Sequence, residues 1–286
     1  MKILARQCDS CQLCPAGSAA GTALLQLERG QADFVVALAG NPNTGKSTVF
    51  NALTGLHQHT GNWPGKTVAR AEGFFTYQGK RFKLVDLPGT YSLMATSYDE
   101  EVARDFLLFG RPDVTIIVVD ATRLERNLNL ALQVLEITDR AVICLNLMDE
   151  ARRHGITVDV PALERELGVP VVAAAARFGQ GIEELVKVVA EVANGERRCH
   201  PRRVGGEAPS LKAAVEQLSQ LLMEAFPGLT NANWVALRLL DGDPKVIEAV
   251  RSGMLGELGE RETLLGGSAP LSQTSTEPPA AQSAKT

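Results

Sequence analysis

A glycine-rich run that contains a lysine has the residue types and spacing of a phosphate-binding loop. Its residues are Gly40, Asn41, Pro42, Asn43, Thr44, Gly45, Lys46, Ser47 and Thr48. The run matches the pattern G-x-x-x-x-G-K-[ST] in full, and it follows an apolar strand pattern and opens a helical pattern, as such a loop must. The glycines let backbone N–H groups face phosphates, and the helix N-terminus adds its positive end. We expect Lys46 to reach the β- and γ-phosphates and the Ser47 hydroxyl to bind Mg²⁺. The alternative is a glycine-rich turn with an incidental lysine.

A second Gly-Lys-Thr, formed by Gly65, Lys66 and Thr67, fails the same test. The pattern needs a glycine five residues before Gly65, and Thr60 stands there. No apolar strand pattern precedes the run, and no clear helical face follows it. Its distance past the first loop suits the mobile segment with which GTPases bring a threonine to Mg²⁺ and the γ-phosphate, so Thr67 is the candidate for that threonine. The alternative is an exposed turn.

Two further motifs follow in the order that GTP-binding domains use. They are Asp86, Leu87, Pro88 and Gly89, which match D-x-x-G, and Asn146, Leu147, Met148 and Asp149, which match N-x-x-D. We expect Asp86 to hold Mg²⁺ through water and the N–H of Gly89 to sense the γ-phosphate. Asp149 can accept from N1–H and from the 2-amino group of guanine. Adenine offers neither donor and would leave a costly unpaired carboxylate. Each motif is weak alone, but two in the right order behind a full phosphate loop predict a GTP-binding domain.

The segment AAAARFGQG occupies the place where such domains carry Ser-Ala on the guanine-binding loop. Here Ala175 and Ala176 stand at those positions, and Arg177 follows. The N–H of Ala176 could donate to the guanine O6. Because the serine hydroxyl is missing at Ala175, the order of this loop and its affinity for guanine come into question.

The wider sequence predicts an α/β protein with a parallel sheet. Short runs rich in Val, Ile and Leu alternate with helical periodicity from Phe34 to about Ala193, which is the pattern of strands buried on both faces. The strand runs are DFVVALAG, RFKLVDLPG, DVTIIVVD, AVICLNLMD and VPVVAAAA. The helical stretches are Lys46–Thr54, Asp99–Phe109, Leu124–Thr138, Val160–Leu167 and Ile182–Val192. After Ala193 a linker rich in Gly, Pro and Arg precedes purely helical patterns at Ser210–Phe226, Asn231–Leu240 and Pro244–Arg251.

Four regions follow from this organisation: an N-terminal extension (1–30), a GTP-binding domain (31–196), a small helical domain (197–264) and a disordered tail (265–286). The 286 residues are 45% hydrophobic and 22% charged, so the chain can bury a core. Its formal net charge of −4 argues against nucleic acid as the main partner. No apolar run is long enough to cross a bilayer, and the N-terminus lacks a signal peptide, so we expect a chain in the cytosol.

Longer runs around these motifs resemble the cytosolic part of the bacterial ferrous iron transport protein B family, FeoB. The matching runs are GNPNTGKSTVFNALTG, GNWPGKTV, DLPGTYSL, NLMDEA and NWVALRLLDGD. The resemblance spans about Phe34 to Asp243 and implies a Ras-like domain followed by a helical domain that modulates nucleotide release. In the family a membrane permease follows, which implies an iron transporter at the cytoplasmic face of the inner membrane. A homo-oligomer is a further expectation.

The catalytic residues that the resemblance implies are Asn43, Lys46, Thr67 and Gly89. Thr90 stands where Ras-type enzymes carry a water-positioning glutamine. Sequence identifies no arginine finger, and we expect Arg70 and Arg104 to be surface residues. Hydrolysis should therefore be slow unless another positive charge is supplied.

In the family a potassium ion can supply that charge. The resemblance implies that its ligands are the Asn43 side chain and backbone carbonyls near Gly61 and Trp63, on a loop that closes over the nucleotide. The alternative for Trp63 is an exposed hydrophobic anchor on a mobile loop.

Three cysteines near the N-terminus, Cys8, Cys11 and Cys14, are not explained by a GTPase. Their spacing is similar to part of an iron–sulfur or zinc ligand set, for which Cys199 or His200 could be the fourth ligand. The alternative is a disordered tail with free thiols. Cys144 lies in a strand pattern and is expected to be a core residue.

The leading hypothesis is thus a GTPase that gates or regulates ferrous iron uptake. The alternative is a nucleotide-dependent binding module, such as a GTPase that acts in ribosome or RNA assembly, which would be expected to carry a basic appended domain. A third hypothesis is an iron-sensing module in which the cysteines matter more than the GTPase.

Overall fold

The computed structural model describes residues 31–55, 58–63, 69–94, 97–203, 209–227, 229, 231–253 and 255. These residues fall into two compact units, which divide at Pro209. Each unit is described by itself. In the described part of the chain, no helix is long and apolar enough to span a membrane.

The first unit is built on one seven-stranded sheet with the order β2-β3-β4-β1-β5-β6-β7. The strands are β1 (Phe34–Gly40), β2 (Gln58–Asn62), β3 (Ala69–Tyr77), β4 (Lys80–Asp86), β5 (Val114–Asp120), β6 (Ala141–Asn146) and β7 (Val171–Ala173). Strands β4, β1, β5, β6 and β7 run parallel, whereas β2 and β3 pair antiparallel at one edge. The five parallel strands are the five predicted runs, since continuous apolar sequence suits strands that are covered on both faces.

Strands β2 and β3 were not predicted from the sequence. The run QHTGN in β2 is polar, and β3 has only a short apolar stretch at its end, so neither shows the signature of a buried strand. Their place at the sheet edge explains why polar residues are tolerated there.

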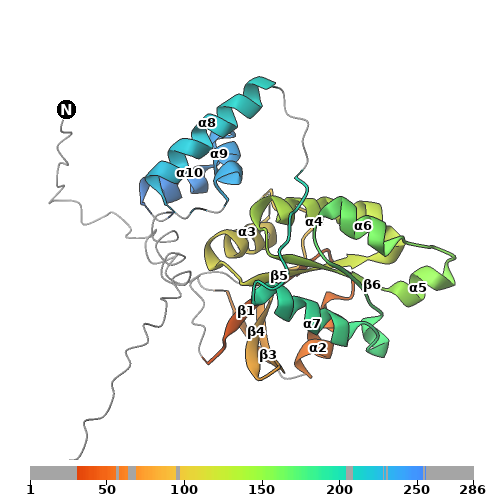
Figure 1. The fold of residues 1–286 in the computed structure, drawn as a ribbon. Coiled ribbons are helices and arrows are strands. Elements are labelled where there is room, and N and C mark those ends of the chain that lie inside the picture. Colours follow the sequence, from red (N-terminus) through yellow and green to blue (C-terminus); the bar gives the residue numbers. More distant parts are fainter. Residues whose placement is uncertain are drawn as a thin grey trace, which may run out of the picture. The chain divides into compact units, whose positions relative to one another are not determined.

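Helices cover both faces of this sheet (Figure 1). They are α2 (Lys46–Thr54), α3 (Tyr98–Asp105), α4 (Leu124–Ile137), α5 (Met148–Arg153), α6 (Val160–Leu167) and α7 (Ile182–Ala193), with 3₁₀ turns η2 (Ala121–Arg123) and η3 (Ala176–Phe178). Helices α2 and α7 lie on one face, and α3, α4 and α6 lie on the other. The predicted helix Asp99–Phe109 is α3 continued by a π-helical turn, η1 (Phe106–Gly110). Helix α5 is additional to the prediction.

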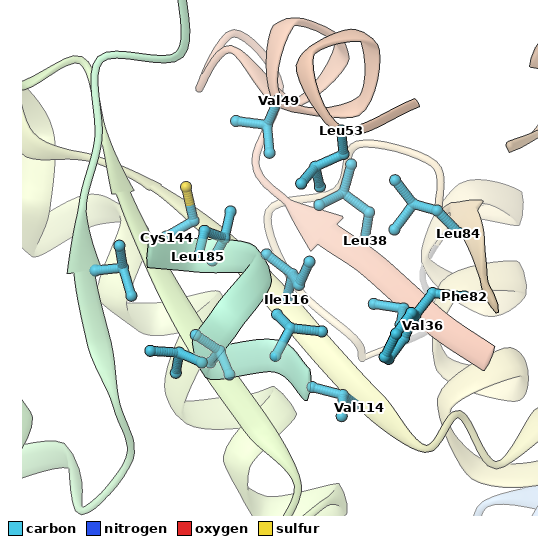
Figure 2. Packing of buried hydrophobic residues seen from close by; sticks show 14 of the residues in the cluster. Val36, Leu38, Val49, Leu53, Phe82, Leu84, Val114, Ile116, Cys144 and Leu185 are labelled. Carbon is cyan, nitrogen blue, oxygen red and sulfur yellow. The ribbon is translucent and has the colours of Figure 1, made fainter. Parts of the chain in front are cut away.

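The main core lies between the sheet and helices α2 and α7 (Figure 2). Val49 and Leu53 of α2 and Leu185 of α7 face Leu38 and Ile116 of the central strands. Cys144 of β6 is fully buried in the same cluster, so its predicted role as a core residue is confirmed. The burial of these apolar side chains stabilises the parallel sheet, and the candidate site lies at the carboxyl ends of its strands.

The second unit contains three helices, α8 (Pro209–Ala225), α9 (Ala232–Leu240) and α10 (Pro244–Arg251), close to the predicted ranges. The carboxylate of Asp243 accepts from the N–H groups of Lys245 and Val246, and Pro244 occupies the first turn, so α10 starts at a well-formed cap. The apolar interior of the second unit contains the buried residues Leu222, Trp234, Val235 and Val246.

Candidate nucleotide-binding site

The predicted phosphate loop joins β1 to α2 and is shaped by two glycines. Gly45 has a φ of +79°, and a Cβ atom there would lie 2.5 Å from Nδ2 of Asn146. A Cβ atom on Gly40 would lie 2.8 Å from the carbonyl oxygen of Val118. Both positions therefore require glycine. Gly45 is also the N-cap of α2 and has no side chain that could accept from the first N–H groups of the helix. Those N–H groups suit an anion.

Lys46 and Asp86 lie at the centre of the site and form an ion pair, in which Nζ of Lys46 donates to Oδ1 of Asp86. Burial raises the pKa of Asp86, and the positive charge of Lys46 opposes that rise. Strand β4 is parallel to β1, and the N–H of Leu87 donates to the carbonyl of Leu38 at 3.0 Å. The D-x-x-G motif is thereby held beside the phosphate loop.

Gly89 and Thr90 complete this side of the site. A Cβ atom on Gly89 would meet backbone atoms of Pro42 at 3.4 Å, so the two motifs are in contact. Thr90 is buried. Its side chain carries a hydroxyl and no amide, so it cannot take the role of the water-positioning glutamine of Ras-type enzymes.

Asn146 connects the phosphate loop with the segment predicted to bind guanine. Its side chain is fully buried, Nδ2 donates to the carbonyl of Thr44 at 3.0 Å, and Oδ1 accepts from the N–H of Ala176 at 3.1 Å. Through these two hydrogen bonds, the side-chain amide joins two loops that are far apart in sequence, and we call this arrangement the Asn146 clamp. The motif predicted that Asn146 belongs to the site, but it did not reveal this bridge.

Asp149 lies in the first turn of α5, next to that clamp. Leu147 adopts a left-handed conformation with a φ of +62°, which turns the chain from β6 into the helix. The N–H of Met148 donates to the carbonyl of Ala174 at 3.1 Å, so α5 starts against the guanine loop. Nη2 of Arg153 donates to Glu150 and lies 4.0 Å from Oδ2 of Asp149. Arg153 is thus paired with Glu150 more closely than with the Asp149 carboxylate.

The guanine loop, Ala174–Arg177, is ordered by its backbone. The N–H of Ala175 donates to the carbonyl of Gln180 at 3.0 Å, and the carbonyl of Ala175 accepts from Phe178 at 2.9 Å. Gly181 has a φ of +78°, and a Cβ atom there would lie 2.2 Å from the carbonyl oxygen of Ala173. The loop is therefore closed without a serine hydroxyl at Ala175. The N–H of Ala176 already donates to Asn146, so its bond to guanine O6 stays a prediction.

Trp63 is buried, with 1% of its side chain exposed, and the alternative of an exposed anchor is wrong. Its indole packs edge-to-face on Phe106 at 5.3 Å, and the guanidinium of Arg70 lies 5.1 Å from its ring centre. Gly61 lies in β2, opposite Arg70 of β3, and Asn43 is exposed with a φ of +66°. The apolar contact with Phe106 explains why the indole is inside.

Neither arginine that was expected at the surface lies free in solvent. Arg104 is 3% exposed and pairs with Asp105, so the expectation of a surface residue is wrong for it. Arg70 is partly buried, its pKa is lowered by that burial, and it pairs with Glu72. Stacking on Trp63 accounts for the position of Arg70.

Several predicted residues lie outside the described part of the chain: Gly65, Lys66, Thr67, Cys8, Cys11 and Cys14. Within the described part, no group of three or more His, Cys, Asp or Glu residues is placed to hold a metal ion. Cys199, a suggested fourth ligand, is half-buried, and its thiol donates to the carbonyl of Ala141 at 3.5 Å.

One polar residue at the same sheet edge was not predicted. Asp120 ends β5 directly beside Asn146 in the ladder, and its Oδ1 accepts from the N–H and the hydroxyl of Thr122, both at 2.7 Å. The sequence signal that could have identified Asp120 is an acidic residue at the carboxyl end of a buried strand, because ligands of such sheets bind along that edge. Its role here is to start η2 with a capped turn.

Two family models match this chain. The model of ferrous iron transport protein B matches residues 34–189, and the model of the FeoB cytosolic helical domain matches residues 208–265. The Fe(2+) transporter FeoB of Escherichia coli K12 is 41% identical over 214 residues, which are 73% of this chain and 27% of that protein. The chain thus spans about a quarter of the length of the curated relatives that it matches.

Solved structures agree with these matches. The cytosolic domain of the Thermotoga maritima FeoB iron transporter in its GDP form II has a TM-score of 0.69 and 39% identity, and the match covers 78% of this chain and 86% of that one. The GMPPNP form of the same domain has a TM-score of 0.68 and 38% identity, with the same coverage. The predicted fold class of this chain, a Ras-like domain with a mainly parallel sheet followed by a small helical domain, is confirmed.

Proposed function

This chain belongs to the ferrous iron transport protein B family, and we propose that its first unit binds and hydrolyses GTP on behalf of a ferrous iron transporter. The observation that carries the proposal is the clamp made by Asn146, which joins the phosphate loop at Thr44 to the guanine loop at Ala176. A nucleotide has its phosphates and its base at opposite ends. A site that fixes the distance between a phosphate loop and a base loop suits such a ligand.

The side chains at the two ends have the chemistry that guanosine phosphates need. Lys46 supplies a charge for the β- and γ-phosphates, and the start of α2 supplies backbone N–H groups. At the other end, Asp149 supplies two acceptor oxygens for N1–H and the 2-amino group of guanine. The GDP and GMPPNP forms of the T. maritima neighbour support both assignments.

Oxygen donors for a magnesium ion lie beside Lys46. Ser47 is the second residue of α2 and Asp86 is the last residue of β4, and hydroxyl and carboxylate oxygens are donors that Mg²⁺ prefers. Thr67 is proposed as a further donor. The ion would neutralise charge that develops on the phosphates. Ser47 and Asp86 would hold the ion, and the backbone N–H of Gly89 would face the γ-phosphate.

Potassium is the second proposed ion, and Asn43 is its side-chain ligand. The Asn43 amide is exposed in the phosphate loop, where a carbonyl-type oxygen can accept a monovalent cation. Backbone carbonyls at Gly61 and Trp63 are the proposed remaining ligands. Because Thr90 has no side-chain amide to replace the missing glutamine at this position, we propose a slow rate that rises with potassium.

The transport role rests on the relatives, which are named Fe(2+) transporters and of which the matched part is about a quarter. We propose that the permease of the full-length protein is the partner, that this part works at the cytoplasmic face of the inner membrane, and that GTP turnover gates or regulates Fe²⁺ uptake. Association between copies and a zinc or iron–sulfur site at Cys8, Cys11 and Cys14 are further proposals. An assembly GTPase is not favoured, because the second unit matches the helical domain of the same family.

The test is a binding and turnover assay on the purified chain. Calorimetric titration should show binding of GDP and of a GTP analogue, with ADP and ATP at least about 100-fold weaker, since adenine leaves Asp149 unpaired. Phosphate release should be seen with GTP and not with ATP. Equal affinity for adenine and guanine nucleotides, or no turnover of GTP, would reject the proposed function.

A further inference from the structure

The segment that follows α7, Arg197–Arg203, lies along the turn between α6 and β7, and we call it the strap. The N–H of His200 donates to the carbonyl of Gly168 at 2.8 Å, and the N–H of Arg202 donates to the carbonyl of Leu167 at 3.0 Å. A Cβ atom on Gly168, whose φ is +71°, would lie 1.9 Å from the carbonyl oxygen of His200. The close approach thus needs a glycine, and the strap is seated on this turn.

Glu164 connects the strap to β7 through both oxygens of its carboxylate. Oε1 accepts from Nη2 of Arg197 at 2.6 Å, and Oε2 accepts from the N–H of Val171 at 3.2 Å. Val171 is the first residue of β7. Arg197 is also 3.9 Å from Glu191 of α7, so its guanidinium lies between two carboxylates. The side chains of Glu164 and Arg197 are 38% and 37% exposed, which limits the strength of their pair.

The strand that Glu164 contacts leads directly into the guanine loop. Strand β7 has only three residues and lies at the edge of the sheet, so it pairs with β6 alone. In the residue directly after β7, the carbonyl of Ala174 accepts from the N–H of Met148, next to Asp149. A short edge strand has few bonds that hold its position along the sheet, and a side-chain acceptor at its first N–H adds one.

We propose that Glu164, held by Arg197, is a positioning residue for the guanine loop, and that this pair slows the release of guanine nucleotide. The proposal rests on the proposed function of the first unit. Loss of the carboxylate frees the N–H of Val171 and lets β7 shift, so the loop at Ala174–Arg177 spends less time in the form that contacts the base. The ion pair of Lys46 and Asp86 belongs to other elements, so we expect the phosphate end of the site to change less than the guanine end.

The experiment compares Glu164→Ala, Glu164→Gln and Arg197→Ala with a matched control, Glu166→Ala. Glu166 is on the same helix and pairs with Arg202 of the same strap at 3.0 Å. Within the described residues, its ion pairs are with Arg202 and Arg165 and not with β7. Release of a fluorescent GDP is followed by stopped flow, and single-turnover hydrolysis is measured at saturating GTP. Amide hydrogen exchange of residues 171–177 is measured without nucleotide.

We expect Glu164→Ala to release GDP about two- to tenfold faster, with unchanged single-turnover hydrolysis and faster exchange at residues 171–177. Glu164→Gln keeps an acceptor for Val171 and should lie between the alanine variant and the wild type. Adding Arg197→Ala to Glu164→Ala should change little, since both act through one pair. Glu166→Ala should behave as the wild type.

Equal release and equal exchange in Glu164→Ala and Glu166→Ala would overturn the proposal. A wild type that binds no GDP would reject the proposed function instead, and the exchange rates would then decide alone whether Glu164 positions the loop. Slower hydrolysis in parallel with faster release would indicate a general loss of structure, which also contradicts a positioning role.

Discussion

Nζ of Lys46 donates a hydrogen bond to Oδ1 of Asp86. The two groups are the charges that the proposed reaction needs most, one for the phosphates and one for Mg²⁺. Burial raises the pKa of the Asp86 carboxyl, and the Lys46 ammonium is what opposes that rise. A triphosphate that drew Lys46 away would therefore remove the counter-charge of Asp86, and a bound magnesium ion would restore it. Under the proposed function, the binding of phosphate and the binding of metal would each strengthen the other.

Lys46→Ala is expected to weaken the binding of GDP and of a GTP analogue by about 10- to 100-fold. The reason is that a hydrogen bond to a charged group contributes about 1.5–3 kcal/mol, and each 1.4 kcal/mol is tenfold in affinity. Calorimetric titration measures the change, and Lys187→Ala, which removes an exposed lysine of α7, is the control. Unchanged affinity for both nucleotides would sink the assignment of the phosphate loop.

Asp149→Asn is expected to weaken GTP by about tenfold or more and to improve the binding of xanthosine triphosphate. The carboxylate accepts two hydrogen bonds from guanine, whereas an amide can donate to the extra carbonyl of xanthine and is not repelled by it. A competition assay between the two nucleotides measures the switch. Glu150→Gln, one residue further in the same helical turn, should keep the preference for guanine. A variant at Asp149 that still prefers guanine would refute the assignment.

The parallel sheet and the order of the site motifs could be predicted from the sequence because both depend on local patterns. Continuous apolar runs identify β1, β4, β5, β6 and β7, and each motif residue stands at the carboxyl end of one of them. Parallel strands bring those ends to one edge of the sheet. In the structure, Lys46 pairs with Asp86 there, and Asn146 donates to the carbonyl of Thr44 in the phosphate loop.

The rest could not be predicted because it depends on contacts between distant residues. An exposed position for Trp63 was left open as an alternative, since nothing near it in sequence shows that Phe106 would cover it. Arg104 lies in a polar run, YDEEVARD, yet it is buried by tertiary packing. The strap belongs to a longer run that was expected to be a linker because it is rich in Gly, Pro and Arg, but partners for the strap arginines come from α6, α7 and the end of α4.

The stability of the first unit is expected to fall with pH above about 9 because of Cys144. Burial raises the pKa of its thiol from 9.0 to about 12. Below pH 9 the thiol keeps its proton in both states, so its contribution is fully present. Between pH 9 and pH 12 the unfolded chain releases the proton and the folded chain keeps it. The free energy of unfolding therefore falls by up to about 1.4 kcal/mol per pH unit in that window.

Urea unfolding of the wild type and of Cys144→Ala at pH 8, 9.5 and 10.5 measures this effect. The variant loses packing at every pH, but it has no thiol to titrate. The difference in unfolding free energy between the two proteins should therefore shrink by up to about 2 kcal/mol between pH 8 and pH 10.5. Cys199→Ala removes a half-buried thiol and should show a smaller change. A constant difference across the three pH values would contradict the burial of an ionisable group at Cys144.

Asn43→Ala is expected to abolish the proposed preference for potassium. Charge develops between the β- and γ-phosphates during hydrolysis, and Thr90 offers no amide to stabilise it. A potassium ion held by the Asn43 amide oxygen and by carbonyls at Gly61 and Trp63 would take that role. Loss of one preorganised electrostatic group from such a site costs about 10²–10³ in rate. The wild type should thus hydrolyse GTP faster in potassium than in sodium or lithium, because the smaller ions fit a cage for potassium poorly.

The measurement is GTP turnover in the three salts at matched ionic strength, for the wild type and for Asn43→Ala. The variant should turn over slowly and equally in all of them. Its affinity for GDP should stay close to that of the wild type, because Lys46 and the backbone of the phosphate loop still bind the phosphates. Asn51→Ala, on the same helix that follows the loop, keeps Asn43 and should retain the response to potassium. Equal wild-type rates in all three salts would mean that Asn43 only shapes the turn, where its left-handed backbone already suits an asparagine.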